Sequence, residues 1–314
     1  MKRASHANLA ANTFVPMQET VVNHSRFFPK NSKVIIFGAG YTGKHLASIL
    51  KKLGVKVICS RRIKKDNPSD FIFDSTTNKL PNEDIFLNTT HILSCIPPDE
   101  NGEDPVINKL GYILKNLKLK WAGYLSTTGV YGDSNGEWVN EEYMPMPNQN
   151  RSKRRLDCES EWINSKLPVQ ILRLPGIYGP GRSALDNLMA NKCRLIDKPG
   201  QIFSRIHIDD IAGAIIHLIN LHGKGIQPKV INIADNLPCR NIDVIYYAAK
   251  LLKIDPPPIE PFHIASNTLS PMALSFWQEN RRVSNKMLCK ELHYSLIHPD
   301  YKSGLIDCLK YITN

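Results

Sequence analysis

From Lys33 onward, short runs of apolar residues alternate with segments in which apolar residues recur with helical periodicity. This alternation is typical of parallel β-α-β units rather than of antiparallel hairpins. The predicted strands are Val34–Phe37, Val55–Ser60, Phe71–Phe73, His91–Cys95, Trp121–Leu125 and Val169–Leu172. The predicted helices between them are Tyr41–Leu53, Asp104–Asn116 and Ser152–Ser165. Because crossovers between parallel strands are right-handed, these elements predict an α/β fold with a doubly wound parallel sheet.

The pattern changes after Arg173. Segments rich in proline and glycine cover residues 174–181 and 255–261, with two strand-like runs between them at Ile202–His207 and Val230–Ile233. We expect residues 33–173, completed by parts of 202–235, to form the sheet domain, and residues 174–314 to form mostly a smaller C-terminal substrate-binding lobe. Ligands of open α/β sheets bind at the carboxyl ends of the strands, so the substrate is expected between the two. Residues 1–32 show no helical period, which predicts a disordered extension.

Composition and charge narrow the class of protein. Of the 314 residues, 42% are hydrophobic and 22% are charged, as in ordinary globular proteins. No apolar run reaches the roughly 18–20 residues of a membrane span. The formal net charge of +11 invites a nucleic-acid hypothesis, but the basic residues are dispersed and no aromatic-interleaved stripe accompanies them. We therefore expect sites for an anionic cofactor or small-molecule substrate, with no nucleic-acid or membrane partner.

The cysteines indicate the compartment. All seven are scattered, and no pair is spaced as C-x-x-C. This favours a reducing compartment without disulfides, and no combination of His, Cys and Asp has the spacing of a metal site. The protein is therefore expected in the cytoplasm, without a bound metal. The acid-poor residues 1–30 leave an organelle transit peptide, and thus the stroma or matrix, as an alternative.

A glycine-rich loop is the first motif that carries chemistry. Gly38, Gly40 and Gly43 follow the first predicted strand and open the first predicted helix, with Tyr41 and Thr42 among them. In this G-x-G-x-x-G pattern the glycines allow a tight turn, a close approach of the backbone to a pyrophosphate, and close packing of helix on strand. The helix N-terminus supplies N–H groups for the phosphates. The loop predicts a Rossmann dinucleotide-binding domain, with a purely structural turn as the alternative.

The end of the second strand indicates which dinucleotide binds. An acid there binds the ribose 2′-hydroxyl of NAD, whereas a cation accommodates the 2′-phosphate of NADP. This chain has Arg61 and Arg62 and no acid at that point. Because guanidinium groups bind phosphate bidentately, NADP(H) is expected in preference to NAD(H). The alternative is that these arginines only favour solubility. Asp74, after the third strand, is expected to accept a hydrogen bond from the adenine amino group.

Four further segments carry a family resemblance. They are Tyr124–Gly132 (YLSTTGVYG), Leu172–Arg182 (LRLPGIYGPGR), Arg205–Ala212 (RIHIDDIA) and Asn285–Leu292 (NKMLCKEL). They resemble the extended short-chain dehydrogenases, the NAD-dependent epimerase/dehydratase family, and most of all an atypical branch similar to bacterial YeeZ-type proteins. The resemblance implies that Thr127 orients the reacting hydroxyl or carbonyl and that Lys153 holds the nicotinamide ribose. Members often pair through a helix bundle, which implies a homodimer by analogy.

One departure from this family affects the chemistry. Typical members have a tyrosine four residues before the lysine, and this chain has Gln149 there. A glutamine amide cannot gain and lose a proton near neutral pH, so the usual acid–base assignment does not transfer. The candidate replacements are Tyr131, Tyr143, Asp133 and His207. Each also has a structural explanation, and for Tyr131 this is packing beneath the site, as across the family.

The same resemblance suggests substrate contacts and a reaction class. Arg182 stands where relatives often bind a substrate anion, with an exposed loop cation as the alternative, and His207 is a second candidate contact. Thr128 and Gly129 replace the Asp and Glu of family dehydratases, which disfavours sugar 4,6-dehydration. Two hypotheses remain. The first is an NADP(H)-dependent oxidoreductase or epimerase-like enzyme acting on a small polar, anionic or sugar-derived molecule. The second is a non-catalytic NADP(H)-binding sensor or regulatory protein.

Overall fold

The computed structural model describes residues 21, 28–63, 70–77 and 79–312. Most of the predicted N-terminal extension therefore lies outside the described residues. Among the helices within these ranges, none combines the length and the apolar character that a membrane crossing requires.

A seven-stranded parallel sheet forms the centre of the fold, with the order β11-β7-β5-β4-β1-β2-β3. Its strands are β1 (Lys33–Phe37), β2 (Lys56–Arg61), β3 (Asp70–Ile72), β4 (His91–Ser94), β5 (Trp121–Thr127), β7 (Val169–Leu174) and β11 (Val230–Asn232). Val34 of β1 pairs with Val57 of β2 on one side and with His91 of β4 on the other. The predicted doubly wound sheet is confirmed, and the direction of strand succession reverses between β1 and β4. Such a reversal is where open α/β sheets bind ligands.

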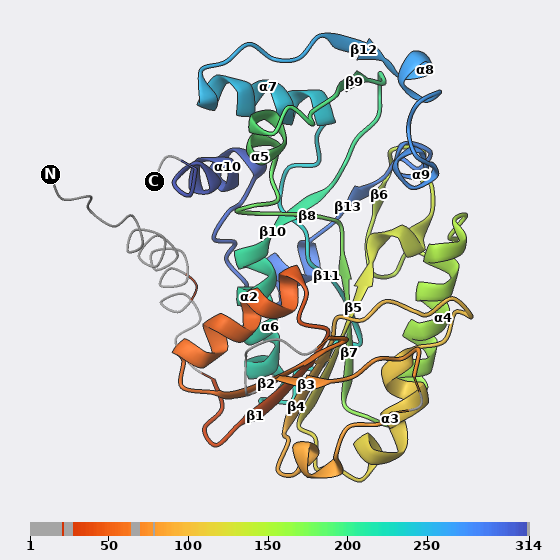
Figure 1. Cartoon of the computed structure of the whole chain (residues 1–314), viewed down its shortest axis with the longest axis vertical. Helices are drawn as coiled ribbons and strands as arrows, with labels where there is room; N and C mark the ends of the chain where they lie inside the picture. The colour runs from red at the N-terminus through yellow and green to blue at the C-terminus, as the bar shows by residue number, and fades with distance from the viewer. Residues whose placement is uncertain (1–20, 22–27, 64–69, 78, 313–314) are drawn as a thin grey trace, which may run out of the picture.

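Helices cover both faces of this sheet, as Figure 1 shows. On one face lie α2 (Tyr41–Lys52) and α6 (Ile208–His222), and on the other lie α3 (Pro105–Lys115) and α4 (Asn150–Asn164). The first pair packs with Ile36 and Leu172 of the sheet, whereas Phe37 and Tyr124 point to the second pair. Adjacent residues Ile36 and Phe37 thus enter opposite cores, because side chains alternate along a strand. Both faces are therefore buried, which explains the nearly continuous apolar runs.

Local sequence explains where the helices begin. The Asp104 side chain accepts hydrogen bonds from the N–H groups of Val106 and Ile107, and Pro105 occupies the first turn of α3. The His207 ring accepts a hydrogen bond from the N–H group of Asp209 and so caps α6. In α2 the capping position is Gly40, which has no side chain to bond the first N–H groups. The start of α2 is therefore available to an external anion.

The C-terminal lobe lies beyond the carboxyl ends of the strands (Figure 1). Its main helices are α5 (Ala184–Met189), α7 (Asn241–Leu252) and α10 (Tyr301–Leu309), and its strands include β9 (Leu195–Asp197) and β12 (Ile259–Pro261). Leu185, Leu195, Ile245 and Leu305 share one apolar core. Residues 174–314 also supply α6 and β11 to the sheet layer, and their assignment to substrate binding stays a prediction.

Smaller elements complete the fold. They are the single-turn segments η1 (Glu83–Phe86), η2 (Thr128–Tyr131) and η3 (Met287–Glu291), the strands β6 (Trp138–Val139), β8 (Gly176–Tyr178), β10 (Arg205–His207) and β13 (Arg282–Val283), and the helices α8 (Phe262–Ala265) and α9 (Pro271–Trp277). The strand predicted at Ile202–His207 is shorter than expected, because only Arg205–His207 pairs with β8.

Candidate cofactor site

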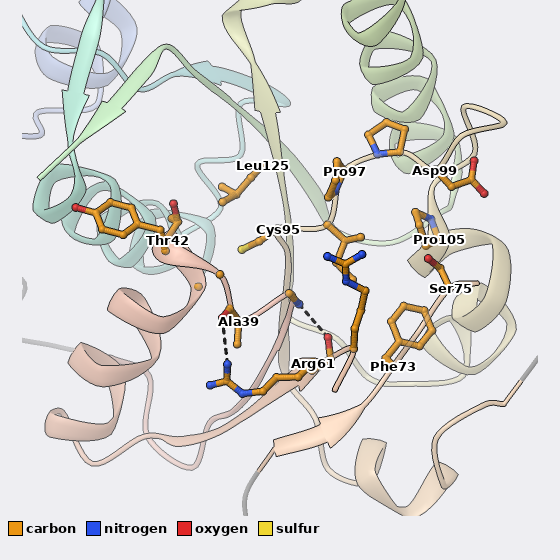
Figure 2. Close-up of a pocket in the computed structure, with 18 of the residues that line it drawn as sticks. Ala39, Thr42, Arg61, Phe73, Ser75, Cys95, Pro97, Asp99, Pro105 and Leu125 are labelled. Carbon is orange, nitrogen blue, oxygen red and sulfur yellow. Dashed lines mark hydrogen bonds between the residues drawn. The ribbon is translucent and has the colours of Figure 1, made fainter. Parts of the chain in front are cut away.

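A cavity of about 920 Å³ opens at the carboxyl edge of the sheet. Its lining comes from the loop after β1, the end of β2, the segment Cys95–Glu100 after β4, and Leu125 and Ser126 of β5. Figure 2 shows Cys95 and Leu125 beside this space, with Thr42 at the start of α2 and Arg61 on the β2 side. Ligand pockets span about 300–1,000 Å³, so the cavity suits a dinucleotide better than a single small metabolite.

The glycines of the loop have three different environments. Gly38 has a φ of +85°, and its N–H group donates to Ser60 Oγ at 2.9 Å, which fixes the tight turn. A Cβ atom on Gly43 would lie 2.6 Å from the Gly38 carbonyl oxygen, so only glycine allows α2 to pack this closely. A Cβ atom on Gly40 would meet no atom within 4 Å. Gly40 therefore faces open cavity, as expected where the backbone approaches a pyrophosphate.

The charge of the lining favours an anion. Its basic residues are Lys44, Arg61, Arg62, Arg154, Arg155 and Arg182, against the acidic residues Asp99 and Glu100. The first turn of α2 contains no acidic residue that would offset the positive end of the helix dipole. A cleft lined mainly by one sign of charge concentrates ligands of the opposite sign. The electrostatics therefore match a ligand that carries several phosphate groups.

Arg61 and Arg62 both line the cavity but have different surroundings. The Arg61 guanidinium forms an ion pair with Asp70 and donates to the Ala39 carbonyl oxygen at 3.3 Å (Figure 2). Asp70 therefore holds Arg61 against the glycine loop. Arg62 is exposed at the cavity mouth. Of the two guanidiniums, Arg62 has more freedom to reorient toward a phosphate.

Asp74 lies beside the cavity without lining it. Its Oδ1 accepts hydrogen bonds from the N–H group of Thr76 at 3.1 Å and from its hydroxyl at 2.8 Å. These hydrogen bonds hold the pKa of Asp74 below its ordinary value. The neighbouring residues Ser75 and Thr76 belong to the lining instead. The predicted contact between Asp74 and adenine stays a prediction.

The two predicted catalytic residues Thr127, at the end of β5, and Tyr131, in the η2 turn that follows, have internal partners. Thr127 Oγ1 accepts a hydrogen bond from the N–H group of Gly129 at 3.1 Å. Tyr131 is fully buried, and its hydroxyl donates to Asn232 Oδ1 at 2.7 Å. The Arg173 guanidinium lies 4.7 Å from the centre of the Tyr131 ring, and burial raises the pKa of this tyrosine. Tyr131 is thus placed as a packed residue beneath the site, with its proton engaged inside the protein.

Helix α4 presents Arg154 and Arg155 to the cavity rather than the predicted Lys153. Lys153 is exposed and lies outside the lining, so the structure does not support its predicted contact with the cofactor ribose. Arg155 lines the cavity, and its Nη1 donates to the Leu125 carbonyl oxygen at 2.8 Å. The helix turns this way because its buried residues are Ser152, Cys158, Glu159 and Trp162. Residues four apart share a helix face, so Arg155 is in phase with Glu159 and Lys153 is not.

The position four residues before Arg155 is Arg151, whose guanidinium lies 4.0 Å from the centre of the Phe276 ring. Gln149 precedes α4, and its Nε2 donates to Gln278 Oε1 at 3.1 Å. Neither Gln149, four residues before Lys153, nor Arg151, four residues before Arg155, is a tyrosine.

Of the two predicted substrate contacts, one lies at the cavity and the other does not. Arg182 lines the cavity, with its guanidinium 5.6 Å from the centre of the Tyr41 ring. The Tyr41 hydroxyl donates to the Pro180 carbonyl oxygen at 3.1 Å and so ties the glycine loop to the segment that carries Arg182. His207 is fully buried, outside the cavity lining, and therefore cannot contact a substrate there in this conformation.

Two ionisable lining groups stay protonated near neutral pH. Burial raises the pKa of the Cys95 thiol to about 12, and burial also raises the pKa of the Tyr41 hydroxyl. A general base at neutral pH needs a pKa near 7. Neither group therefore has a pKa suited to a general base near neutral pH.

Sequence reasoning missed the loop Cys95–Glu100, Ser126 and Arg155 as lining residues. The loop did have a signal, because it follows a buried strand, and the carboxyl ends of such strands surround the ligand. Ser126 and Arg155 had a weaker signal, since their roles depend on how β5 and α4 are oriented. Ser126 donates to Glu159 Oε1 at 2.5 Å, and Glu159 in turn accepts from Arg173 Nη2 at 2.7 Å.

Solved structures resemble this chain over most of its length. A conserved protein of unknown function from Silicibacter pomeroyi DSS is 35% identical, with 88% of this chain and 98% of that one covered and a TM-score of 0.78. A putative NAD-dependent epimerase/dehydratase from Methylobacillus flagellatus is 26% identical, with 91% and 100% covered and a TM-score of 0.70. Human epimerase family protein SDR39U1 (isoform 2), solved with NADPH, is 16% identical, with 90% and 100% covered and a TM-score of 0.69, which shows a shared fold alone.

The sheet order, the glycine loop and the cavity at the strand ends define a Rossmann-fold, NAD(P)-binding class of protein. Together with these relatives, they show that the chain belongs to the NAD-dependent epimerase/dehydratase family. No protein-family model and no curated protein sequence matches it. The predicted membership of a YeeZ-like branch stays a prediction.

Proposed function

We propose that this protein is an NADP(H)-dependent oxidoreductase that acts on a small anionic molecule. The observation that carries the proposal is the cavity itself, where the Gly40 backbone faces open space and six basic side chains line the walls against two acidic ones. The human relative by fold was solved with NADPH, which is consistent with this cofactor.

The residues present fit the cofactor. The open side of Gly40 and the start of α2 would hold the pyrophosphate, and Arg61 and Arg62 would hold the 2′-phosphate. Arg155 would take the place of the family's lysine beside the nicotinamide ribose. When bound, the nicotinamide supplies the hydride that is transferred, and the protein supplies mainly orientation. Arg182, on the far side of the glycine loop, would bind the anionic group of the substrate.

Cofactor preference gives the first prediction. We expect NADP to bind at least tenfold more tightly than NAD in titration calorimetry. A hydrogen bond to a charged group contributes about 1.5–3 kcal/mol, which is about ten- to a hundredfold in affinity. Arg62→Ala should reduce the ratio by about tenfold. Arg61→Ala should also reduce it, with an added loss for both cofactors because Arg61 contacts the glycine loop. Lys52→Ala, an exposed change at the far end of α2, is the control. Equal affinities of the unaltered protein for NADP and NAD would refute the preference.

Turnover gives the second prediction. We expect the unaltered protein to oxidise NADPH, followed by absorbance, with at least one member of a panel of carbonyl compounds and nucleotide sugars. No tyrosine stands four residues before Lys153 or Arg155, which is the spacing in the family. Gln149→Tyr and Arg151→Tyr are therefore compared as two ways of restoring it. A rate increase in only one of them identifies the position equivalent to the family's tyrosine. If the natural chain stays inactive and a restored variant turns over, the natural protein is not an oxidoreductase.

A non-catalytic NADP(H)-binding sensor is the second candidate, and a specific observation favours it. The hydroxyl of Tyr131 is bonded to Asn232, and burial keeps Tyr41 and Cys95 protonated near neutral pH. A sensor needs tight binding without turnover. Under this proposal, NADPH and NADP should differ in affinity, and no member of the substrate panel should oxidise bound NADPH.

A further inference from the structure

Four metal-ligating side chains meet at the junction of the sheet domain and the C-terminal lobe. They are His207 and Asp209 at the start of α6, His298 before α10, and Asp307 within α10. One ligand atom from each lies within 4.8 Å of the ligand atoms of the other three. His298 and Asp209 are 89 residues apart in the chain, so the spacing of the sequence gave no sign of this cluster.

The cluster is built around one carboxylate oxygen. Asp209 Oδ2 lies 3.3 Å from His298 Nε2 and 3.7 Å from His207 Nδ1. The two imidazole rings lie with their centres 4.0 Å apart. Asp307 Oδ2 is buried and has no hydrogen-bond partner among the described residues. Leaving a buried polar atom unsatisfied costs about 1–3 kcal/mol, so this oxygen calls for a partner.

The charges of the cluster call for a cation. Asp209 is completely buried, and the side chains bonded to it are the imidazoles of His45 and His298. Lys310 pairs with Oδ1 of Asp307 at 3.0 Å, whereas Oδ2 of that carboxylate has no hydrogen-bond partner among the described residues. Two carboxylates, those of Asp209 and Asp307, therefore share the cluster, with the Lys310 ammonium beside Asp307. A cation held between the two carboxylates would give the unsatisfied Asp307 oxygen a partner.

We propose that His207, Asp209, His298 and Asp307 bind one divalent transition-metal ion. The His207 Nδ1 accepts the Asp209 N–H group at 3.3 Å and its Nε2 lies 3.8 Å from Cys308 Sγ, so the ring would exchange one of these contacts for the ion. Two imidazole nitrogens and two carboxylate oxygens form a donor set that Zn²⁺ accepts, whereas Mg²⁺ and Ca²⁺ prefer oxygen ligands throughout. Zinc–nitrogen bonds of about 2.0–2.1 Å place tetrahedral ligand atoms about 3.3 Å apart, so binding draws the four side chains together.

The surroundings resemble the outer shell of a metal site. His45 Nε2 lies 2.7 Å from Oδ1 of Asp209, which orients this carboxylate with Oδ2 toward the imidazoles. Such outer partners fix ligand orientation in metal sites. His45 belongs to α2, the helix that begins at the glycine loop. The ion would therefore tie α6 to α10 and, through His45, to the cofactor helix. Because the site is closed, its role is structural rather than catalytic.

Metal binding is tested on the full chain after treatment with a chelator. We expect one equivalent of Zn²⁺ in a competition titration, with a rise in melting temperature that Mg²⁺ does not produce. Co²⁺ should give visible d–d absorption of a four-coordinate site. Asp307→Asn and His298→Gln should each weaken Zn²⁺ binding at least tenfold and remove the Co²⁺ bands. His263→Gln changes an exposed histidine of α8 and should alter neither.

The readout is independent of NADP binding and of turnover, so it stands apart from the proposed function. If Asp307→Asn and His298→Gln are folded by circular dichroism and bind Zn²⁺ as the unaltered protein does, the ion binds elsewhere and the proposal fails. If these variants do not fold, the Zn²⁺ titration and the Co²⁺ spectrum of the unaltered protein alone test the proposal. Less than one tight equivalent of Zn²⁺, or Co²⁺ without d–d bands, would show that the cluster is only a hydrogen-bond network.

Discussion

Gly40→Val should abolish dinucleotide binding while the protein stays folded. A Cβ atom at this position meets no atom within 4 Å, and the backbone φ of −79° is open to any residue. Valine therefore fits the protein but fills the space through which the pyrophosphate approaches the start of α2. Valine is a poorer helix cap than glycine, a loss of stability of about 1 kcal/mol. We expect NADP and NAD affinity to fall more than a hundredfold in titration calorimetry, with little change in melting temperature.

Gly43→Val is the matched variant, three residues further along the same loop. There a Cβ atom would lie 2.6 Å from the Gly38 carbonyl oxygen and 3.1 Å from a side-chain carbon of Ile36. The clash separates α2 from β1, so the melting temperature itself should fall. The pair distinguishes a site that lost its ligand from a domain that lost its packing. Wild-type affinity in Gly40→Val would mean that no phosphate approaches this backbone, and the proposed cofactor site would be wrong.

Much of the sheet could be predicted because its signal is local. Each buried parallel strand is a short apolar run, and each crossover helix has its own period. The predictions of strand ends were less accurate, because the end of a strand depends on its pairing with a neighbouring strand. β5 continues to Thr127 since the register with β7 runs on to Leu174, which no property of Thr127 itself indicates. Helix α6 showed no clear period because nearly all of its sides are buried.

Within the candidate site, some residues could also be located from local sequence, whereas others depend on the tertiary structure. The glycine loop and Arg61 lie in one contiguous stretch, so the sequence was sufficient to locate them. Arg154 and Arg155 of α4 line the cavity and Lys153 does not, because the phase of this helix follows from its buried side. That side includes Glu159, a charged residue that a hydrophobicity pattern assigns to the surface. Tyr131 and its partner Asn232 are 101 residues apart, so the bond that occupies the tyrosine hydroxyl needed the tertiary structure.

Glu159→Gln should be among the most destabilising single changes in the chain. Glu159 and Arg173 are 2% and 4% exposed, and Glu159 accepts hydrogen bonds from Arg173 Nε at 3.0 and 3.3 Å and from Nη2 at 2.7 Å. Glutamine keeps the shape but leaves the buried guanidinium without its counter-charge. Removing one member of a buried pair costs about 3–5 kcal/mol. Urea unfolding should show this loss, and Asp157→Asn on the exposed face of α4 should show almost none.

Replacing both Glu159 and Arg173 measures what the intact ion pair contributes to the free energy of unfolding, separately from the penalty of leaving one charge unpaired. Taking two charges out of water is unfavourable, so buried pairs replaced by apolar residues of similar size often leave stability unchanged or raised. Glu159→Leu with Arg173→Met should therefore recover most of the stability that Glu159→Gln loses. It cannot recover the contact with Ser126, whose hydroxyl donates to Glu159 at the cavity wall. Restored stability with weakened NADP binding would assign the pair to positioning the end of β5, whereas restored binding would leave it a packing role alone.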